Sequence, residues 1–143
     1  MPPTIRLILL QIKKRNLDNM YEIITIASMI EKEAAVSKDR PTISGVIHNR
    51  LKIDMPLQID ATVLYALGKH KETVYDVDLT VDSLYNTYRY GGLPSGPIAS
   101  PGKASIAAAI NPEKHNYYYY VAKGDGSHYF TKNYDDHLRA KAK

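Results

Sequence analysis

The chain has 143 residues, of which 44% are hydrophobic and 24% charged, a balance that predicts one soluble globular domain rather than a disordered chain. It contains no cysteine, which excludes disulfide bonds and thiolate metal sites. The net charge of +4 would suit a polyanionic partner, but basic residues near both ends supply much of it and are typical of a solvated surface. The apolar run Leu7–Leu10 is too short for a signal peptide or a membrane span, so the chain as written is expected to be soluble.

Four helices are predicted in the first half of the chain. Residues 4–16 and 18–37 both have helical periodicity. A third helix is expected at about 42–51, and a shorter one over 60–67 would be closed by Gly68. In the second helix the apolar positions form a stripe that we expect to be buried, made of Ile23, Ile26, Ala27, Ile30 and Ala34.

The middle of the chain is expected to be irregular before one more helix forms. Residues 74–79 could be a short strand or a loop, and the glycines and prolines of 91–97 predict a shaped loop. Ser100 as a cap, with Pro101 in the first helical position, predicts a helix that ends at about Ile110.

A β-hairpin is predicted near the end of the chain. Residues 117–122 and 128–131 have the composition of strands, and 123–126 is a strong turn signal. Residues 134–143 are expected to form a terminal helix or a frayed tail. The sequence has no internal repeat and no linker, so the expected fold is α+β, a single compact domain over residues 1–143 with helices first and a late β-hairpin.

Two glutamates on the second predicted helix are candidates for acid/base chemistry. Glu31 and Glu33 fall on the two edges of the apolar stripe when the helix is drawn at about 100° per residue, so periodicity does not choose between them. A carboxyl group at such an edge is partly desolvated, which raises its pKa towards neutrality, as a glycosidic acid catalyst requires. The alternative is that both are surface residues of an amphipathic helix.

Two further clusters could bind a carbohydrate. Residues 49–62 mix amides and carboxylates, among them Asn49, Gln58 and Asp60, which suit sugar hydroxyls and N-acetyl groups. The alternative is that Asp60 caps the following helix and Arg50 forms an ion pair. In the second cluster, aromatic faces and an amide precede the stiff loop, at Tyr85, Asn86, Thr87 and Tyr88. The tyrosines of 117–120 are expected simply to alternate between core and solvent.

The sequence gives no sign of a metal or cofactor site. Its five histidines are scattered, without the spacing of a zinc motif. The acidic stretch 76–82 resembles the start of a calcium loop, but Val81 stands where glycine is required and Thr87 where the bidentate glutamate should be. We therefore expect no cofactor and no metal.

Read together, these segments resemble the MltG (YceG-like) family of endolytic murein transglycosylases over roughly residues 22–137. The resemblance is carried by ordered motifs at 27–33, 49–51, 55–62, 85–88, 92–102, 104–112, 119–122 and 126–130. It implies a lysozyme-like catalytic core that cleaves peptidoglycan glycan strands without hydrolysis and leaves 1,6-anhydro-N-acetylmuramic acid ends. The chain departs from the family at Ile59, Ala61 and Ser95, which affects the expected shape of the subsites more than activity.

The resemblance also assigns residues. Glu33 corresponds to the catalytic glutamate, which resolves the choice left open by the helical wheel. Gln58, Asp60, Asn86 and Tyr88 are expected to bind substrate, with Glu31, Asn49, Tyr85 and Thr87 in supporting roles.

Partners and location are likewise implied by the family. The expected partners are peptidoglycan glycan strands and peptidoglycan synthases, at the extracytoplasmic face of the cell membrane. The membrane anchor and LysM-like region that precede this domain in the family are not found in this sequence. Two alternatives remain: a peptidoglycan-binding or scaffold module that lacks turnover in isolation, and a nucleic-acid-binding protein, which the charge and tyrosines only weakly favour.

Overall fold

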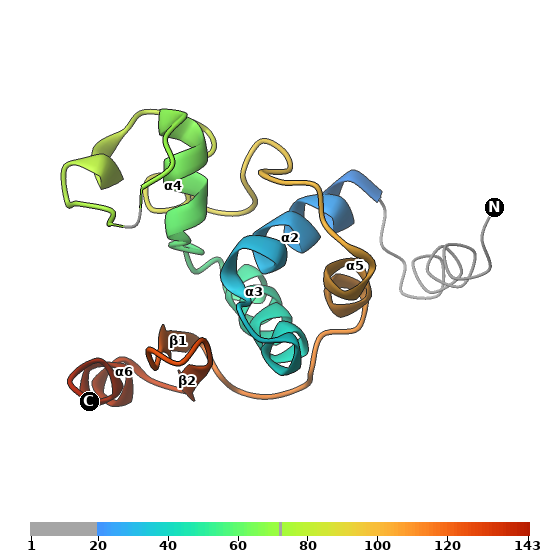
Figure 1. Cartoon of the computed structure of the whole chain (residues 1–143), viewed down its shortest axis with the longest axis vertical. Helices are drawn as coiled ribbons and strands as arrows, with labels where there is room; N and C mark the ends of the chain where they lie inside the picture. Colours follow the sequence, from blue (N-terminus) through green and yellow to red (C-terminus); the bar gives the residue numbers. More distant parts are fainter. Residues whose placement is uncertain (1–19, 72) are drawn as a thin grey trace.

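The structure, a computed structural model, describes residues 20–71 and 73–143. The helix expected over 4–16 lies outside the described residues. Three helices pack together at the centre of the molecule, α2 (Met20–Glu33), α3 (Arg40–Lys52) and α5 (Lys103–Ile110) (Figure 1). A short 3-10 helix, η1 (Ser37–Asp39), connects α2 to α3.

Helix α2 is central because its apolar residues recur on one face. The predicted stripe is confirmed: all five of its residues are buried, and Met29 joins them. The helix is shorter than predicted and ends at Glu33 rather than at residue 37. Glu33 is therefore the last residue of the helix, and it lies at the edge of the packed core.

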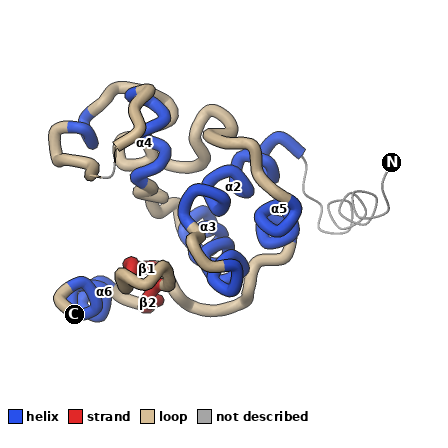
Figure 2. Tube along the Cα trace, in the orientation of Figure 1, coloured by secondary structure: helices blue, strands red, loops and turns tan. Residues whose placement is uncertain are grey.

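Helix α4 (Asp60–Leu67) lies to one side of the three central helices (Figure 1). It ends as predicted at Gly68, whose φ of 67° is the left-handed conformation that glycine adopts readily. The chain then forms turns and a 3-10 helix, η2 (Asp78–Thr80), drawn mainly as loop in Figure 2. Of the two alternatives for 74–79 the loop is therefore correct. The Asp78 carboxylate organises it by accepting from the Tyr75 N–H and the Lys71 ammonium.

The predicted start of helix α5 was wrong. The helix begins at Lys103 with Gly102 in the N-cap position, and neither Ser100 nor Pro101 acts as its start. The reason is a tertiary contact. The Glu31 side chain of α2 accepts hydrogen bonds from the Gly102 N–H and the Ser105 hydroxyl, both at 2.9 Å. A carboxylate from another helix thus takes the place of a local cap.

The hairpin and a last helix lie on the same flank of the central helices as α4, below it in the view of Figure 1. Strands β1 (Tyr119–Ala122) and β2 (His128–Thr131) pair antiparallel, with Tyr120 opposite Phe130. The hairpin is confirmed, although its first strand begins two residues later than expected. Residues Tyr134–Lys141 form α6, so the alternative of a frayed tail is excluded for them. The Asn133 side chain caps α6 by accepting from the Asp136 N–H.

This arrangement confirms the α+β fold class with helices first and a late hairpin. Within residues 20–71 and 73–143, none of the helices combines the length and the apolar character needed to cross a membrane.

Candidate active site

A cavity of about 470 Å³ opens at the carboxyl end of α2. Glu33 lines it, together with residues of the 57–60 segment, strand β1 and helix α6. The sequence-predicted residues Gln58, Asp60 and Tyr88 also lie in its wall. Four candidates from three separate parts of the sequence are thus brought together.

Glu33 has the electrostatic surroundings of an acid/base group. Its side chain is half-buried, and burial is the main reason that its pKa is raised from 4.5 to about 7. The negative charge of Asp60 raises it further, whereas a hydrogen bond from the Tyr120 hydroxyl to Oε1, at 3.2 Å, acts in the opposite direction. Near neutral pH, Glu33 therefore populates both its acid and its carboxylate form.

Asp60 supplies a second carboxyl group to the same cavity. It is the first residue of α4 and its side chain does not cap that helix, so the capping alternative was wrong. Its Oδ1 accepts a hydrogen bond from the Tyr88 hydroxyl. Burial, followed by this bond, raises the pKa of Tyr88, which keeps the phenol protonated as a donor. Tyr88 therefore fixes the direction of the Asp60 carboxylate.

Gln58 holds its place through an unusual backbone conformation. Its φ of 52° is left-handed, and its N–H donates to the carbonyl of Thr87 at 3.2 Å. The adjacent Leu57 and Ile59 are buried, while the Gln58 side chain is exposed on the cavity wall. The two neighbours anchor the segment and leave the amide available to a ligand.

Tyr120 is the site residue that sequence reasoning missed. It was expected only to alternate between core and solvent, yet its hydroxyl reaches Glu33. Burial and the nearby Glu33 raise its pKa well above the ordinary value, so it acts as a hydrogen-bond donor. Its ring meets His128 edge to face, with centroids 5.5 Å apart. The run of four consecutive tyrosines, 117–120, carries no pattern that singles out Tyr120, so no sequence signal could have identified it.

Arg50 forms the back of the cavity, and the ion pair considered for it was wrong. Its buried guanidinium donates to three backbone carbonyls instead: Tyr118 at 2.7 Å, Pro56 at 2.8 Å and Leu57 at 3.0 Å. It also lies over the Tyr119 ring, 5.1 Å from the centroid. One side chain thus joins α3 to the 56–57 segment and to the hairpin.

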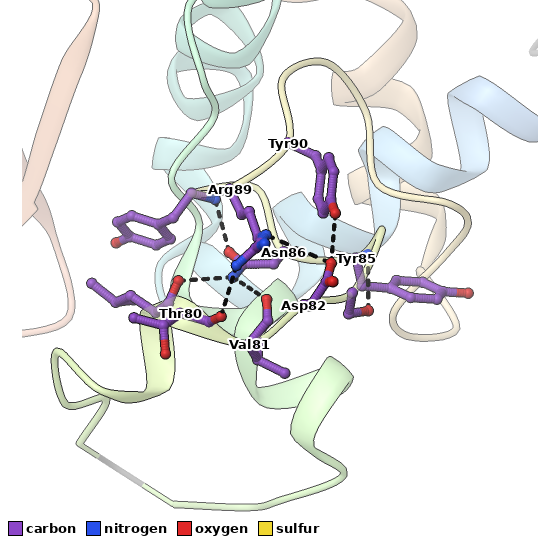
Figure 3. Close-up of polar contacts among 10 residues, drawn as sticks. Thr80, Val81, Asp82, Tyr85, Asn86, Arg89 and Tyr90 are labelled. Atoms are coloured by element: carbon purple, nitrogen blue, oxygen red, sulfur yellow. Dashed lines mark hydrogen bonds and ion pairs between the residues drawn. The ribbon is translucent and has the colours of Figure 1, made fainter.

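Asn86 lies outside the cavity wall. Its side chain is fully buried; the amide nitrogen donates to the carbonyls of Leu79 and Val81, each at 2.9 Å, and the amide oxygen accepts from the Tyr88 N–H. Figure 3 shows this amide at the centre of the loop. Polar contacts link Arg89, Tyr90 and Asp82 around it. The contacts give Asn86 a positioning role, because it fixes the backbone that carries Tyr88.

The four supporting candidates also lie outside the cavity wall. Thr87 is buried and its hydroxyl accepts from the Ile59 N–H at 2.9 Å, which fixes the segment that carries Gln58 and Asp60. Asn49 donates to the carbonyls of the 115–117 segment. Tyr85 packs against Tyr65, with ring centroids 4.7 Å apart. Glu31, as described above, joins α2 to α5.

A buried Asp39–His128 pair lies beside Tyr120, and His128 also lines the cavity. His128 Nδ1 lies 3.0 Å from Asp39 Oδ2, and both side chains are at least nine-tenths buried. The pair joins η1 to strand β2 next to the tyrosine that contacts Glu33. Nothing in the sequence connected these two residues, since they are 89 positions apart and neither belongs to a recognisable metal or catalytic pattern.

The described residues offer no place for a metal ion. No group of three or more histidine or acidic side chains within 20–71 and 73–143 has the geometry to hold one. The acidic stretch 76–82 instead makes local contacts: Asp78 pairs with Lys71 at 2.5 Å, and Asp82 pairs with Arg89 at 3.6 Å.

Comparison with known proteins indicates one family. The YceG-like family model matches residues 6–143. An endolytic murein transglycosylase of Bacillus subtilis is 49% identical over 91% of this chain, and one of Streptococcus pneumoniae is 42% identical over 90%. The chain spans only 36% and 24% of those two proteins.

A solved structure shares the fold. The crystal structure of a yceG-like protein from Listeria monocytogenes superimposes with a TM-score of 0.84 at 45% sequence identity, over 90% of this chain and 41% of that one. The family match over nearly the whole chain, the relatives and this shared fold agree with each other and with the predicted resemblance. The chain belongs to the YceG-like family.

Proposed function

We propose that this chain is the catalytic domain of an endolytic peptidoglycan lytic transglycosylase, with Glu33 as its acid and then its base. The observation that carries the proposal is the half-buried Glu33 carboxyl group, whose pKa of about 7 lets one residue serve both steps. The names of the Bacillus and Streptococcus relatives support the same reaction class. The bond cleaved is the β-1,4 bond between N-acetylmuramic acid and N-acetylglucosamine.

The reaction needs two proton transfers through one carboxyl group. Protonated Glu33 donates its proton to the glycosidic oxygen, and the bond from that oxygen to the anomeric carbon breaks. The 6-hydroxyl of the muramic acid then attacks the anomeric carbon while the Glu33 carboxylate takes the hydroxyl proton. The result is a 1,6-anhydro end with no water consumed, and Glu33 returns to its acid form.

Neighbouring residues would stabilise the charge that develops between these steps. Positive charge builds up at the anomeric carbon, and the Asp60 carboxylate, directed by Tyr88, supplies a negative charge in the same cavity. Tyr120 donates to the carboxylate form of Glu33 and so favours the step in which Glu33 releases its proton. Gln58 offers an amide for the hydroxyl or N-acetyl groups of the sugar.

Asp60 also makes hydrolysis a second candidate function. Ordinary glycosidases use two carboxyl groups, one as acid and the other as nucleophile or base. Glu33 and Asp60 line the same cavity and interact electrostatically. If Asp60 activated a water molecule, the product would carry a reducing end instead of an anhydro end.

The substrate determines the proposed location and partners. Peptidoglycan lies outside the cytoplasmic membrane, so we place the working site of the full-length protein at the extracytoplasmic face. Peptidoglycan synthases, which supply new glycan strands, are the proposed protein partners.

Product analysis in isotopically labelled water tests this proposal. Uncrosslinked glycan strands are incubated with the chain in ¹⁸O-water, and the soluble fragments are analysed by mass spectrometry. We expect fragments that are lighter than the reducing form by one water and carry no ¹⁸O. Reducing-end fragments labelled with ¹⁸O would establish hydrolysis instead. Strands that co-sediment with the chain but remain uncut would indicate a binding module without turnover.

A further inference from the structure

A second cavity, of about 640 Å³, lies beside the candidate active site. It is formed by the end of α2, one face of α4, the 68–71 segment and Ile98. On α4 its lining residues recur at helical spacing, at Ala61, Leu64 and Tyr65, and Gly68 follows the end of the helix. None of the residues discussed for catalysis lines it.

Neighbouring residues of α2 and of α4 line the two cavities. Lys32 lines the second cavity while Glu33 lines the first, and Ala61 lines the second while Asp60 lines the first. Both cavities are therefore lined by the carboxyl end of α2 and the amino end of α4, two helices that contact each other. A ligand held at Glu33 and Asp60 would have these shared helix ends along which to extend a branch towards the second cavity.

The charges of the two cavities differ. The second is lined by three lysines and a histidine, Lys32, Lys69, Lys71 and His70, with no acidic residue among its lining residues. Lys71 is paired with Asp78. Lys32 and Lys69 are exposed, and neither forms an ion pair with an acidic side chain of the described part of the chain. Anionic groups would therefore be attracted to this cavity.

The remaining lining of the second cavity is apolar. Ala61, Leu64 and Ile98 contribute aliphatic groups, and Tyr65 contributes an aromatic ring. A free inorganic anion would gain little binding free energy from this apolar lining. A ligand that carries both carboxylates and small aliphatic side chains would use both parts of the lining.

We propose that this second cavity is a subsite for the stem peptide of the glycan strand. This inference rests on the proposed function. A stem peptide branches from the lactyl group of N-acetylmuramic acid, contains alanine and glutamic acid residues, and ends in a free carboxylate. A muramic acid bound at Glu33 and Asp60 would place that branch at the boundary between the cavities. The lysines bind its carboxylates, and the apolar floor accepts its methyl groups.

Substrate pairs that differ only in the peptide test the proposal. The kcat/KM values are measured on strands with intact stem peptides and on strands stripped of them by an amidase. Lys69→Glu reverses one charge in the cavity; its control is Lys52→Glu, which makes the same change of net charge at an exposed position that lines neither cavity. We expect Lys69→Glu to lower the ratio of kcat/KM for intact to stripped strands by about tenfold. Lys52→Glu should leave this ratio unchanged.

Three results would overturn the subsite. The ratio could be the same in the parent and in Lys69→Glu, it could fall equally in Lys52→Glu, or the parent could cleave both substrates equally well. The second of these would mean that only the net charge matters.

A binding measurement separates failure of the subsite from failure of the proposed function. If the parent cleaves neither substrate, the proposed function fails, and the free tetrapeptide is titrated against the parent and Lys69→Glu by calorimetry. We expect affinity to fall about tenfold in Lys69→Glu. Equal affinity would overturn the subsite. Equally tight binding of sodium phosphate alone would identify a general anion site and overturn the assignment to a peptide.

Discussion

The ionisation of Glu33 is controlled by burial and by two neighbouring groups that act in opposite directions. Burial has the largest effect and disfavours the carboxylate. The negative charge of Asp60 adds to this effect, whereas the hydrogen bond from Tyr120 stabilises the carboxylate. The proposed first step needs the acid form, so kcat/KM should decline as the pH rises through about 7.

Substitutions of these neighbours should shift that decline in opposite directions. Tyr120→Phe removes a hydrogen bond to the carboxylate, so the pKa of Glu33 rises and the decline moves to higher pH. Asp60→Asn removes a negative charge, so the pKa falls and the decline moves to lower pH. We expect shifts of roughly one pH unit in profiles of kcat/KM against pH. Shifts in the same direction would contradict this account, whatever the loss of overall rate.

At the scale of elements, the close approach of α3 to the 113–115 segment depends on Gly45. A Cβ atom at this position would collide with the Glu113 carbonyl oxygen and the His115 ring. In a free helix, Gly→Ala stabilises by about 0.5–1 kcal/mol, but overpacking costs about 1–3 kcal/mol. Gly45→Ala should therefore lower the free energy of unfolding by about 1–2 kcal/mol, measured by urea denaturation.

Gly91→Ala is the matched control for this prediction. A Cβ atom at Gly91 would meet nothing within 4 Å, and the φ of this residue is not positive. Its free energy of unfolding should stay within about 0.5 kcal/mol of the parent. If both alanine variants were as stable as the parent, the packing of α3 against 113–115 would be looser than the structure has it.

Helix positions could be predicted from the sequence wherever local chemistry determines them. The bounds of the helix over 60–67 were predicted correctly, because the helix ends at a local signal, the left-handed φ of Gly68. The start of α5 was missed because its N-terminal partner, Glu31, comes from another helix. The hairpin followed from its turn and strand composition, whereas the loop at 74–79 depends on Asp78 contacts that periodicity does not reveal.

The candidate site could be predicted only in part, for the same reason. Gln58, Asp60 and Tyr88 were identified through a family resemblance, and the cavity contains all three. Tyr120 contacts Glu33 across 87 positions and His128 contacts Asp39 across 89, so both contacts arise only from tertiary packing. Asn86 has the polarity of a substrate-binding residue, but its amide is used to support the loop (Figure 3).

At the scale of the whole molecule, Arg50 connects the segments that surround the cavity. Its guanidinium donates hydrogen bonds to three backbone carbonyls. These carbonyls lie in two segments that belong to different parts of the fold. Arg50→Met would leave these acceptors without their donor, and we expect a loss of about 3 kcal/mol and a fall in Tm of roughly 10 °C. Arg50→Lys should recover only part of this, because an ammonium cannot reproduce the planar fork of the guanidinium.

Arg89→Met provides the control for this prediction. Arg89 is exposed, and its ion pair with Asp82 has a distance of 3.6 Å. Such surface pairs contribute at most about 1 kcal/mol. Calorimetric Tm values should therefore separate the two arginines clearly, and equal losses would contradict the role given to Arg50.

The central claim is that Glu33, and not Glu31, performs the chemistry. Both glutamates belong to α2, and replacing either with glutamine keeps the shape of the side chain. Glu31→Gln retains an oxygen that can accept from Gly102 and Ser105, so the link between α2 and α5 should persist. Glu33→Gln would remove both the proton donor and the base of the proposed mechanism.

Folding of the Glu33 variant can be checked independently. The folded-state pKa of Glu33, about 7, exceeds 4.5, so the folded state binds more protons than the unfolded state between these values. Glu33 therefore contributes stability at low pH that is lost as the pH rises from about 4.5 to about 7. Glu33→Gln does not ionise, and its Tm at pH 8 should equal or exceed that of the parent.

The most direct test is the rate at which anhydro-ended fragments are released from glycan strands by the parent, Glu33→Gln and Glu31→Gln. We expect Glu33→Gln to lower the rate by at least about 10³-fold, because in the proposed mechanism one residue carries both proton transfers, and Glu31→Gln to stay within a few-fold of the parent. Release by Glu33→Gln at the rate of the parent, or an equal loss in a folded Glu31→Gln, would contradict the account.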